Sequence, residues 1–492
     1  MKLEISPADV SRCLLCYDAP CNDGCEKKLK PATILRSLRF SNYSRVFSKI
    51  NNSCIDCSAS CEKSCLLEEP VKIKKILSRC EMEKERLSIN LKKGNLNANF
   101  CGIKLENPFI LSSSVVASSY DMCKRAFEAG WAGVSFKTVS LIDIHEASPR
   151  YSAIKNLDGS ILAFKNIEQL SDHSVIENLE IFRKLKTEFP TKLLLVSIMG
   201  RNEEEWKYLA KAVEGAGADA IELNFSCPNM VEDDTGSDVG QIPDLVYKYT
   251  KAAVDAVSIP VVAKLTPNVT SMKDSAIMAV KAGASGIAAI NTIKSITELN
   301  LIQNIFKNQK NMNIAIGGLS GPAVKPIALR FIAELSSLPE LENIHISAMG
   351  GVVTYADAIM YLALGAGSIQ VTTAVMEYGY RIIDDLVSGL EYFIGGAGLN
   401  SVTEIQGLIR KNVVDIEKIE RDYVIYPKFI KSKCIGCGRC YISCMDGGHQ
   451  AIRFENRIPR LDPKKCVGCH LCILVCPARA IESSEIKVKK EC

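Results

Sequence analysis

The cysteines near the C-terminus carry the spacing of iron–sulfur ligands. They read Cys434-x₂-Cys437-x₂-Cys440-x₃-Cys444 and then Cys466-x₂-Cys469-x₂-Cys472-x₃-Cys476-Pro477. This is the spacing of bacterial two-cluster ferredoxins, in which the fourth cysteine of each run ligates the other cluster. The pattern predicts one [4Fe–4S] cluster on Cys434, Cys437, Cys440 and Cys476, and another on Cys466, Cys469, Cys472 and Cys444. A pair of zinc sites is the alternative, and eight cysteines in a doubled pattern disfavour it.

A second group of eight cysteines lies near the N-terminus. It reads Cys13-x₂-Cys16-x₄-Cys21-x₃-Cys25 and then Cys54-x₂-Cys57-x₃-Cys61-x₃-Cys65. Eight thiolates suffice for two four-iron clusters, but this spacing is less standard than that of the C-terminal runs. Zinc, or a single cluster, remains an alternative for this segment.

One further cysteine, Cys227, lies in the segment ELNFSCPN that spans residues 222–229. A cysteine at the end of a barrel strand, flanked by Asn and Ser, is a candidate acid, base or nucleophile. A buried structural thiol is the plain alternative.

Residues 100–400 alternate strand-sized apolar runs with segments of helical period. The runs that indicate strands are 108–112, 133–138, 193–199, 220–224, 260–265, 286–291, 344–348 and 368–372. Eight such units predict an α/β fold, a (β/α)₈ TIM barrel, rather than an open sheet. We predict three domains: a Cys-rich helical iron–sulfur segment (1–92), the barrel (93–420) and a ferredoxin-like domain with two clusters (421–492).

Polar residues gather where the predicted barrel strands end, which is where the chemistry of such barrels takes place. They are Lys137 and Thr138; Asn224, Ser226 and Cys227; Lys264 and Thr266; Asn291 and Thr292; Gly350 and Gly351; and Thr372 and Thr373. Lysines that end apolar runs are poor candidates for solvated surface residues.

Composition excludes several classes of protein. The net charge of +4 gives no broad footprint for nucleic acid. No apolar run reaches the roughly 18 residues of a membrane span, and no signal region opens the chain. Clustered cysteines without a secretion signal indicate metal or cluster binding rather than disulfides. We therefore expect a cytoplasmic protein that contacts neither membrane nor nucleic acid.

Several segments resemble flavin-dependent dihydropyrimidine dehydrogenases. Beside residues 222–229, the matching segments are FKNIE (164–168), KLTPN (264–268), NTIKSIT (291–297), GSDVGQ (236–241), CGRCYISC (437–444) and DGGHQ (446–450). Together they resemble the FMN- and iron–sulfur-containing catalytic subunit of the bacterial NAD-dependent enzymes. The segment CLLCYDAP (13–20) is similar to the N-terminal segment of dihydropyrimidine dehydrogenases and of the glutamate synthase small subunit. That similarity implies one cluster on Cys13, Cys16, Cys21 and Cys65, and a second on Cys25 with cysteines from Cys54, Cys57 and Cys61.

The resemblance implies reduction of the C5–C6 double bond of uracil or thymine, with FMN bound in the barrel. Cys227 would protonate C5 while reduced flavin delivers hydride to C6, because a thiol is mostly protonated at neutral pH. Asn166, Asn224, Asn291 and Thr292 would hold the pyrimidine, with assistance from Ser226. Lys137, Lys264, Ser113 and Thr138 would face the flavin ring. The FMN phosphate would lie on Gly321, Gly350, Gly351, Thr372 and Thr373.

The electron source is not apparent in the chain. No G-x-G-x-x-G follows a predicted strand, so we expect no dinucleotide-binding domain. Electrons would come from an NAD(P)H/FAD-binding partner subunit or a ferredoxin, in a hetero-oligomer or homodimer. The polar segment 228–241, with three acidic residues at 232–234, could act as a lid or be a plain solvated loop. Two alternatives remain: a dihydroorotate dehydrogenase-type enzyme, and an electron-transfer subunit with an inactive barrel.

Overall fold

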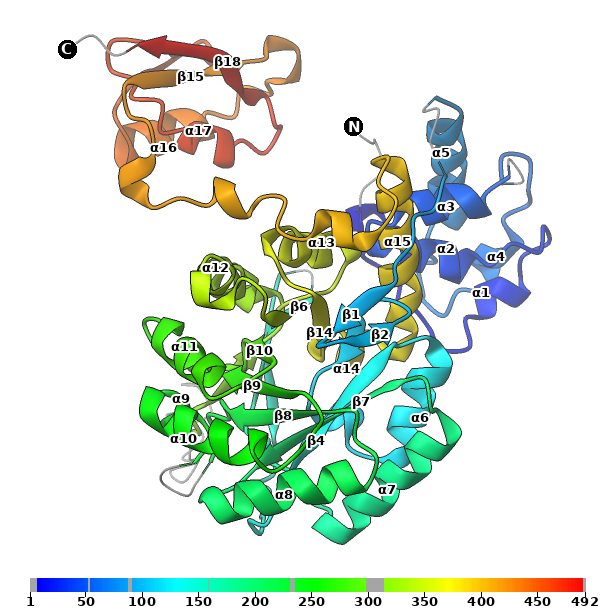
Figure 1. Ribbon diagram of the computed structural model, residues 1–492. Coiled ribbons are helices and arrows are strands. Elements are labelled where there is room, and N and C mark those ends of the chain that lie inside the picture. Colours follow the sequence, from blue (N-terminus) through cyan, green and yellow to red (C-terminus); the bar gives the residue numbers. More distant parts are fainter. Residues whose placement is uncertain are drawn as a thin grey trace, which may run out of the picture. The chain divides into compact units, whose positions relative to one another are not determined.

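The chain folds into two compact units, Met1–Asn412 and Val413–Cys492. The computed structural model describes residues 7–51, 54–86, 91–157, 159–230, 235–297 and 314–489. The first unit contains the N-terminal cysteines, and the second contains the C-terminal cysteines. Figure 1 shows the barrel of the first unit. None of the described helices is long and apolar enough to cross a membrane.

Eight parallel strands close into a barrel in the order β10-β13-β14-β3-β4-β7-β8-β9. Every strand predicted from the apolar runs is one of these eight, so the (β/α)₈ prediction is confirmed. Their buried side chains fill the barrel interior, as in other barrels of this kind. The strands are β3 (Phe109–Leu111), β4 (Gly133–Ser140), β7 (Leu193–Met199), β8 (Ala220–Phe225), β9 (Val261–Leu265), β10 (Gly286–Ala289), β13 (His345–Met349) and β14 (Ser368–Val371).

Helices surround the barrel (Figure 1). Helix α13 shows how the sequence sets their ends: Thr354 and Asp357 form a capping box at its start, and Gly365, with φ of 116°, follows its end. The helices are α6 (Tyr120–Ala129), α7 (Val175–Glu188), α8 (Glu203–Gly215), α9 (Ser237–Gly240), α10 (Pro243–Val254), α11 (Lys273–Lys281), α12 (Lys325–Ser336), α13 (Tyr355–Leu364), α14 (Thr373–Tyr378) and α15 (Ile383–Gly396). Shorter 3₁₀ turns are η2 (Val115–Ala117), η4 (Pro322–Val324), η5 (Pro339–Leu341), η6 (Tyr380–Ile382), η7 (Val402–Ile405) and η8 (Arg410–Asn412).

Two small antiparallel sheets accompany the barrel, and the sequence analysis did not predict them. Strands β1 (Ala98–Phe100) and β2 (Ile103–Leu105) form a hairpin. A four-stranded sheet has the order β11-β12-β6-β5, with β5 (Tyr151–Lys155), β6 (Ile161–Asn166), β11 (Ile293–Ser295) and β12 (Gly317–Ser320). These strands are mostly half-exposed and therefore lack the apolar run that identifies a barrel strand. A Cβ at Gly318 would lie 2.0 Å from Thr292 Oγ1, so β12 approaches Thr292 closely only because glycine stands there.

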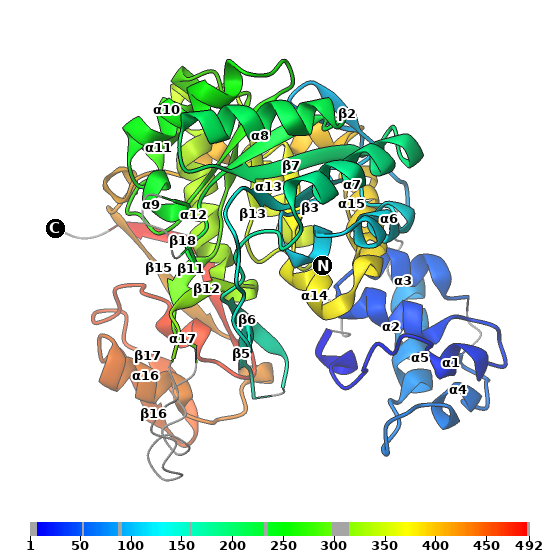
Figure 2. The same ribbon diagram turned by 90° about the horizontal axis from the view of Figure 1, so that it is seen from below.

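The N-terminal segment is helical, and within the first unit it packs against helix α15 of the barrel. It comprises η1 (Pro7–Val10), α1 (Pro20–Asp23), α2 (Pro31–Arg39), α3 (Tyr43–Lys49), α4 (Ser60–Lys63) and α5 (Ile73–Arg86). Its buried residues, among them Leu35, Leu38 and Phe47, form a hydrophobic core separate from that of the barrel. Figure 2 shows α2 and α3 beside α15 of the barrel.

A buried ion pair joins this segment to α15. The Arg36 Nε lies 2.7 Å from Asp385 Oδ2, and the Asp385 side chain is 0% exposed. Ser37 also donates a hydrogen bond to Asp385. Asp384, in contrast, is 48% exposed and lies 2.8 Å from Arg36 Nη2. Most of the polar attachment therefore depends on Asp385.

We expect Asp385→Ala to lower the free energy of unfolding by about 3–5 kcal/mol, because it removes the fully buried carboxylate and leaves the buried Arg36 guanidinium with only the half-exposed Asp384. The matched variant Asp384→Ala removes a more exposed partner and should cost less than about 1 kcal/mol. Denaturant unfolding of both variants measures the difference. Equal losses of stability in the two variants would contradict the assignment.

The second unit has two similar halves. Each half carries one cysteine run and a helix, α16 (Arg439–Gly447) or α17 (Leu471–Leu474). Cys440, Cys472, Ile452 and Ile481 form its small core. The remaining elements are η9 (Ile416–Lys418), η10 (Lys431–Lys433) and the antiparallel pairs β15 (Tyr423–Phe429) with β18 (Ile481–Lys489) and β16 (Ile452–Glu455) with β17 (Ile458–Leu461).

Candidate active site and cluster sites

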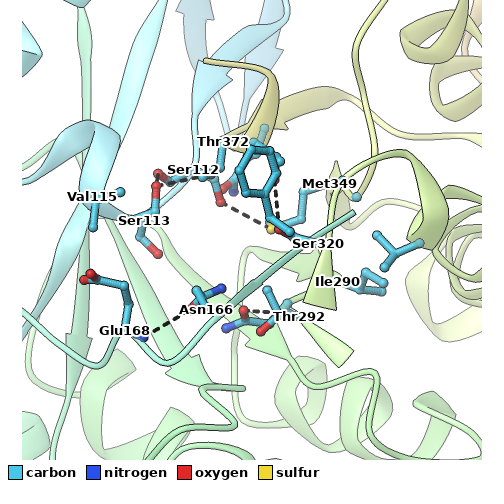
Figure 3. A pocket seen from close by; sticks show the side chains of 18 of the residues that line it. Ser112, Ser113, Val115, Asn166, Glu168, Ile290, Thr292, Ser320, Met349 and Thr372 are labelled. Carbon is cyan, nitrogen blue, oxygen red and sulfur yellow. Dashed lines mark hydrogen bonds between the residues drawn. The ribbon is translucent and has the colours of Figure 1, made fainter. Parts of the chain in front are cut away.

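A deep pocket opens at the carboxyl ends of the barrel strands. It contains about 1140 Å³ of space free of atoms, including its open mouth. Figure 3 shows Ser113, Glu168, Asn166 and Thr292 around it. Strand ends, the β5–β6 sheet and the start of α14 all contribute residues to its lining. The pocket thus lies where the sequence predicted the barrel chemistry.

All but one of the residues predicted for the flavin and the pyrimidine line this pocket. Ser226 is the exception, because it is fully buried behind the lining. The others are Cys227, Asn166, Asn224, Asn291, Thr292, Ser113, Lys137, Thr138, Lys264, Gly321, Gly350, Gly351, Thr372 and Thr373.

Hydrogen bonds hold the polar residues of one wall in a chain. Asn291 Nδ2 donates to Ser226 Oγ at 2.8 Å, and Ser226 Oγ donates to Asn224 Oδ1 at 2.8 Å. Asn224 Nδ2 in turn donates to Thr138 Oγ1 at 2.9 Å. Ser226 therefore fixes two amides that face the pocket rather than facing it itself.

Asn229 is a lining residue that the sequence analysis did not assign. Its amide donates to Glu168 O at 2.9 Å and to Asn166 Oδ1 at 3.3 Å, so it links the segment after β8 to β6. Its own Oδ1 is buried and has no hydrogen-bond partner among the described residues. Val231–Asp234, the acidic part of the segment considered as a lid, lies outside the described residues.

Both pocket lysines are buried and paired with carboxylates. Lys137 Nζ lies 2.9 Å from Glu168 Oε2, and Lys264 Nζ lies 3.1 Å from Glu222 Oε1. The two lysines are 5% and 2% exposed, so they are not solvated surface residues. Among the described residues of the lining they are the only cations.

The Cys227 thiol is buried and protonated at neutral pH. Burial raises its pKa to about 11, although a backbone N–H of Asn229 and the charges of Lys264 and Lys137 favour the thiolate. The Cys227 carbonyl accepts the backbone N–H of Ser237 at 2.9 Å. A thiol in this state can donate a proton to a bound molecule.

Glycines and threonines form the far end of the pocket. Gly350 and Gly351 have φ of 125° and 69°, and a Cβ at Gly351 would lie 2.8 Å from Gly321 O. Thr373 Oγ1 donates to Ser320 Oγ at 3.0 Å. Glycine backbone with hydroxyls nearby suits a phosphate such as that of FMN.

The C-terminal cysteines gather in two groups of four. Each group takes three cysteines from one run and the fourth from the other, as the ferredoxin spacing predicts. Each group surrounds a small cavity: one is lined by Cys434, Cys437, Cys440 and Cys476, and the other by Cys444, Cys466, Cys469 and Cys472.

The N-terminal cysteines also separate into two groups. Cys13, Cys16, Cys21 and Cys65 line one small cavity. Burial raises the pKa of both Cys54 and Cys61 to about 12, and the neighbouring thiols Cys25 and Cys57 add to the rise. Among the described residues, no group of three or more His, Cys, Asp or Glu side chains is arranged to hold one metal ion.

Comparisons with known proteins identify the family. The dihydroorotate dehydrogenase family matches residues 95–394, and a 4Fe-4S dicluster domain matches residues 428–483. The NAD-dependent dihydropyrimidine dehydrogenase subunit PreA of Escherichia coli (strain K12) is 48% identical over 398 residues, 80% of this chain and 97% of that protein. The chain belongs to the dihydropyrimidine/dihydroorotate dehydrogenase family. It is a dihydropyrimidine dehydrogenase-type oxidoreductase with an iron–sulfur domain, and the predicted resemblance is confirmed.

Two other relatives extend the comparison. The catalytic subunit of dihydroorotate dehydrogenase B (NAD(+)) of Pyrococcus abyssi is 37% identical over 318 residues, 64% of this chain and 99% of that protein. A solved DHODH from Eimeria tenella, in complex with ferulenol, has a TM-score of 0.55 at 19% identity and covers 66% of this dehydrogenase and 92% of that chain. The second comparison supports the barrel fold alone.

Several residues around the pocket were not predicted from the sequence, among them Glu168, Glu222, Gln370 and Asn229. Two of them had a usable signal. Glu222 and Gln370 each precede an assigned residue, Asn224 or Thr372, by two positions in a predicted strand, 220–224 or 368–372. Side chains two apart on a strand share a face, so both had to point into the barrel.

Proposed function

We propose that this dehydrogenase reduces the C5–C6 double bond of uracil or thymine to the 5,6-dihydropyrimidine, or catalyses the reverse reaction. The observation that carries the proposal is the buried, protonated Cys227 thiol in a pocket lined by Asn166, Asn224 and Asn291. Each amide offers both a donor and an acceptor, which suits the alternating carbonyl and N–H groups of a pyrimidine.

The pocket suits FMN. Lys137, Lys264, Ser113 and Thr138 would face its ring, while Gly321, Gly350, Gly351, Thr372 and Thr373 would hold its phosphate. When bound, FMN supplies the hydride for C6 of the pyrimidine. Cys227 holds the proton that C5 receives, and the amides hold the pyrimidine plane against rotation.

The charge of the pocket favours a neutral pyrimidine over orotate. A carboxylate substrate calls for an unpaired cation, and the two cations of the described lining already have carboxylate partners at 2.9 and 3.1 Å. The alternative, a dihydroorotate dehydrogenase-type reaction, has the support of the Pyrococcus abyssi relative. Electrostatics argues for the neutral substrate.

We further propose four [4Fe–4S] clusters that relay electrons from a partner. The sixteen cysteines of the two Cys-rich regions support this number, because twelve of them line three small cavities in groups of four. The other four, Cys25, Cys54, Cys57 and Cys61, are neighbours whose charges act on one another. The word "subunit" in the name of the Escherichia coli relative supports a partner protein. We propose that this partner is either a flavoprotein that binds NAD(P)H or a ferredoxin. Free cysteines that bind clusters rather than form disulfides also support a reducing, cytoplasmic location.

The rate of pyrimidine reduction should depend on pH through Cys227. Because the thiol donates only when protonated, the rate at saturating substrate should stay level from about pH 7 to pH 10 and fall towards the Cys227 pKa of about 11. The reverse reaction needs the Cys227 thiolate, so its rate should rise as the pH approaches the Cys227 pKa of about 11. Initial rates across pH measure both limbs. A decline of the forward rate centred near pH 8.5, the value for an exposed thiol, would contradict this assignment.

Ligand binding tests the proposed substrate directly. The anaerobically purified protein should contain one FMN per chain, and uracil or thymine should perturb the flavin absorbance while orotate should not. The variant Asn224→Leu should weaken uracil binding and retain FMN, because it removes one amide from the pyrimidine wall. Perturbation by orotate alone would favour the dihydroorotate reaction instead.

A further inference from the structure

A fully buried carboxylate, Glu222, lies behind the lining of the pocket and holds three residues that do line it. Its Oε1 accepts hydrogen bonds from Ser113 Oγ at 2.9 Å and from Lys264 Nζ at 3.1 Å. Its Oε2 accepts from Gln370 Nε2 at 3.0 Å. Glu222 itself is 0% exposed, and Ser113, Lys264 and Gln370 all line the pocket.

The position of Glu222 is costly for a charged group. Interior layers of such barrels are usually packed with apolar side chains, and an unpaired buried carboxylate would lose several kcal/mol of solvation. Four donors offset that cost here, since Ser135 Oγ also donates to Oε1 at 3.2 Å. Lys264 is the single cation among the hydrogen-bond donors of this carboxylate. The buried pair is therefore neutral as a whole.

We infer that Glu222 is a positioning residue of the flavin site: it fixes the direction of Lys264, Ser113 and Gln370, and it balances the charge that Lys264 presents to the bound flavin. This inference rests on the proposed function only in requiring that FMN occupies the pocket. Because reduction adds negative charge to a flavin, the Glu222 carboxylate keeps the reduction potential of the bound flavin lower than Lys264 alone would set it.

The variant Glu222→Gln removes the charge of the side chain and keeps its shape. Its carbonyl oxygen can still accept from Lys264 and Ser113, while its new NH₂ faces Gln370. The Gln370 Oε1 is buried and has no hydrogen-bond partner in the part of the chain that the structure describes, so rotation of that amide supplies the acceptor that the new NH₂ needs. Folding should therefore survive this substitution.

The experiment is an anaerobic redox titration of the bound flavin without substrate. Glu222→Gln should favour the reduced flavin at least tenfold, a rise of about 30 mV for a two-electron couple. The matched control is Asp219→Asn. Asp219 precedes the same strand, pairs with Lys186 at 2.8 Å and does not line the pocket, so its removal should leave the potential unchanged. An unchanged or lower potential in Glu222→Gln would overturn the inference.

A double-mutant cycle tests whether Glu222 acts through Lys264. In a Lys264→Met background Glu222 has no lysine to position or to neutralise, so adding Glu222→Gln should change the potential little. An undiminished rise in that background would show that Glu222 acts directly on the flavin and would overturn the positioning role. If the unmodified protein binds no FMN, the proposed function fails; if it binds FMN and Glu222→Gln has no effect, the inference alone fails.

Discussion

Replacement of Cys227 by alanine should lower the rate of uracil reduction by about 10²–10⁴-fold, the usual contribution of a general acid. The thiol is buried in the pocket, and burial raises its pKa to about 11, so it is the proton donor placed at the substrate. Binding of FMN and uracil should persist, because the amides and lysines that hold them remain. The measurement is the turnover rate beside the two binding constants.

A matched control separates this effect from a general loss of a buried sulfur. Cys123 is 0% exposed in the barrel core and does not line the pocket, so Cys123→Ala should leave turnover near that of the unmodified protein. Cys227→Ser should restore a fraction of the rate, because a hydroxyl can donate a proton less readily than a thiol. Unchanged turnover in Cys227→Ala would end the assignment of this cysteine as the acid.

The second large effect concerns the clusters. The protein isolated without oxygen should contain about sixteen iron atoms per chain, and Cys440→Ala or Cys61→Ala should each remove about four of them. Each cysteine belongs to a different group of four, one in each Cys-rich region. Turnover supported by a ferredoxin should stop in a variant that lacks a cluster on the route to the barrel.

Iron analysis with electron paramagnetic resonance of the dithionite-reduced protein measures this loss. Cys80→Ala is the control, because Cys80 is buried on α5 and lies outside the four groups. About eight iron atoms in the unmodified protein would limit the clusters to two. Bound zinc at either region would contradict the cluster assignment there.

The barrel could be predicted from the sequence because its strands are buried on both faces. Runs such as Leu193–Met199 are continuously apolar, and a polar residue at the end of such a run stands out. Lys264 and Asn224 can be predicted in this way from the sequence alone. The groups of C-terminal cysteines followed from spacing alone, since few arrangements other than two clusters satisfy that doubled pattern.

Other features depend on contacts between residues far apart in the sequence. The sheet that contains β6 has half-exposed strands, so no apolar run indicates it, although it positions Asn166. The ion pair of Arg36 with Asp385 joins residues 349 positions apart. Glu222 belongs to the segment 222–229, which the sequence singles out, but the sequence does not indicate its partners. Only the structure shows that Lys264, Ser113 and Gln370 donate hydrogen bonds to it.

The most direct test of the proposed function is anaerobic turnover with reduced methyl viologen as electron donor and with uracil, thymine or orotate as substrate. Loss of pyrimidine absorbance reports the reaction, and NADH serves as a comparison donor. The account predicts consumption of uracil or thymine with viologen and none with NADH alone. Consumption of orotate only, or of no pyrimidine by protein that contains FMN, would contradict it.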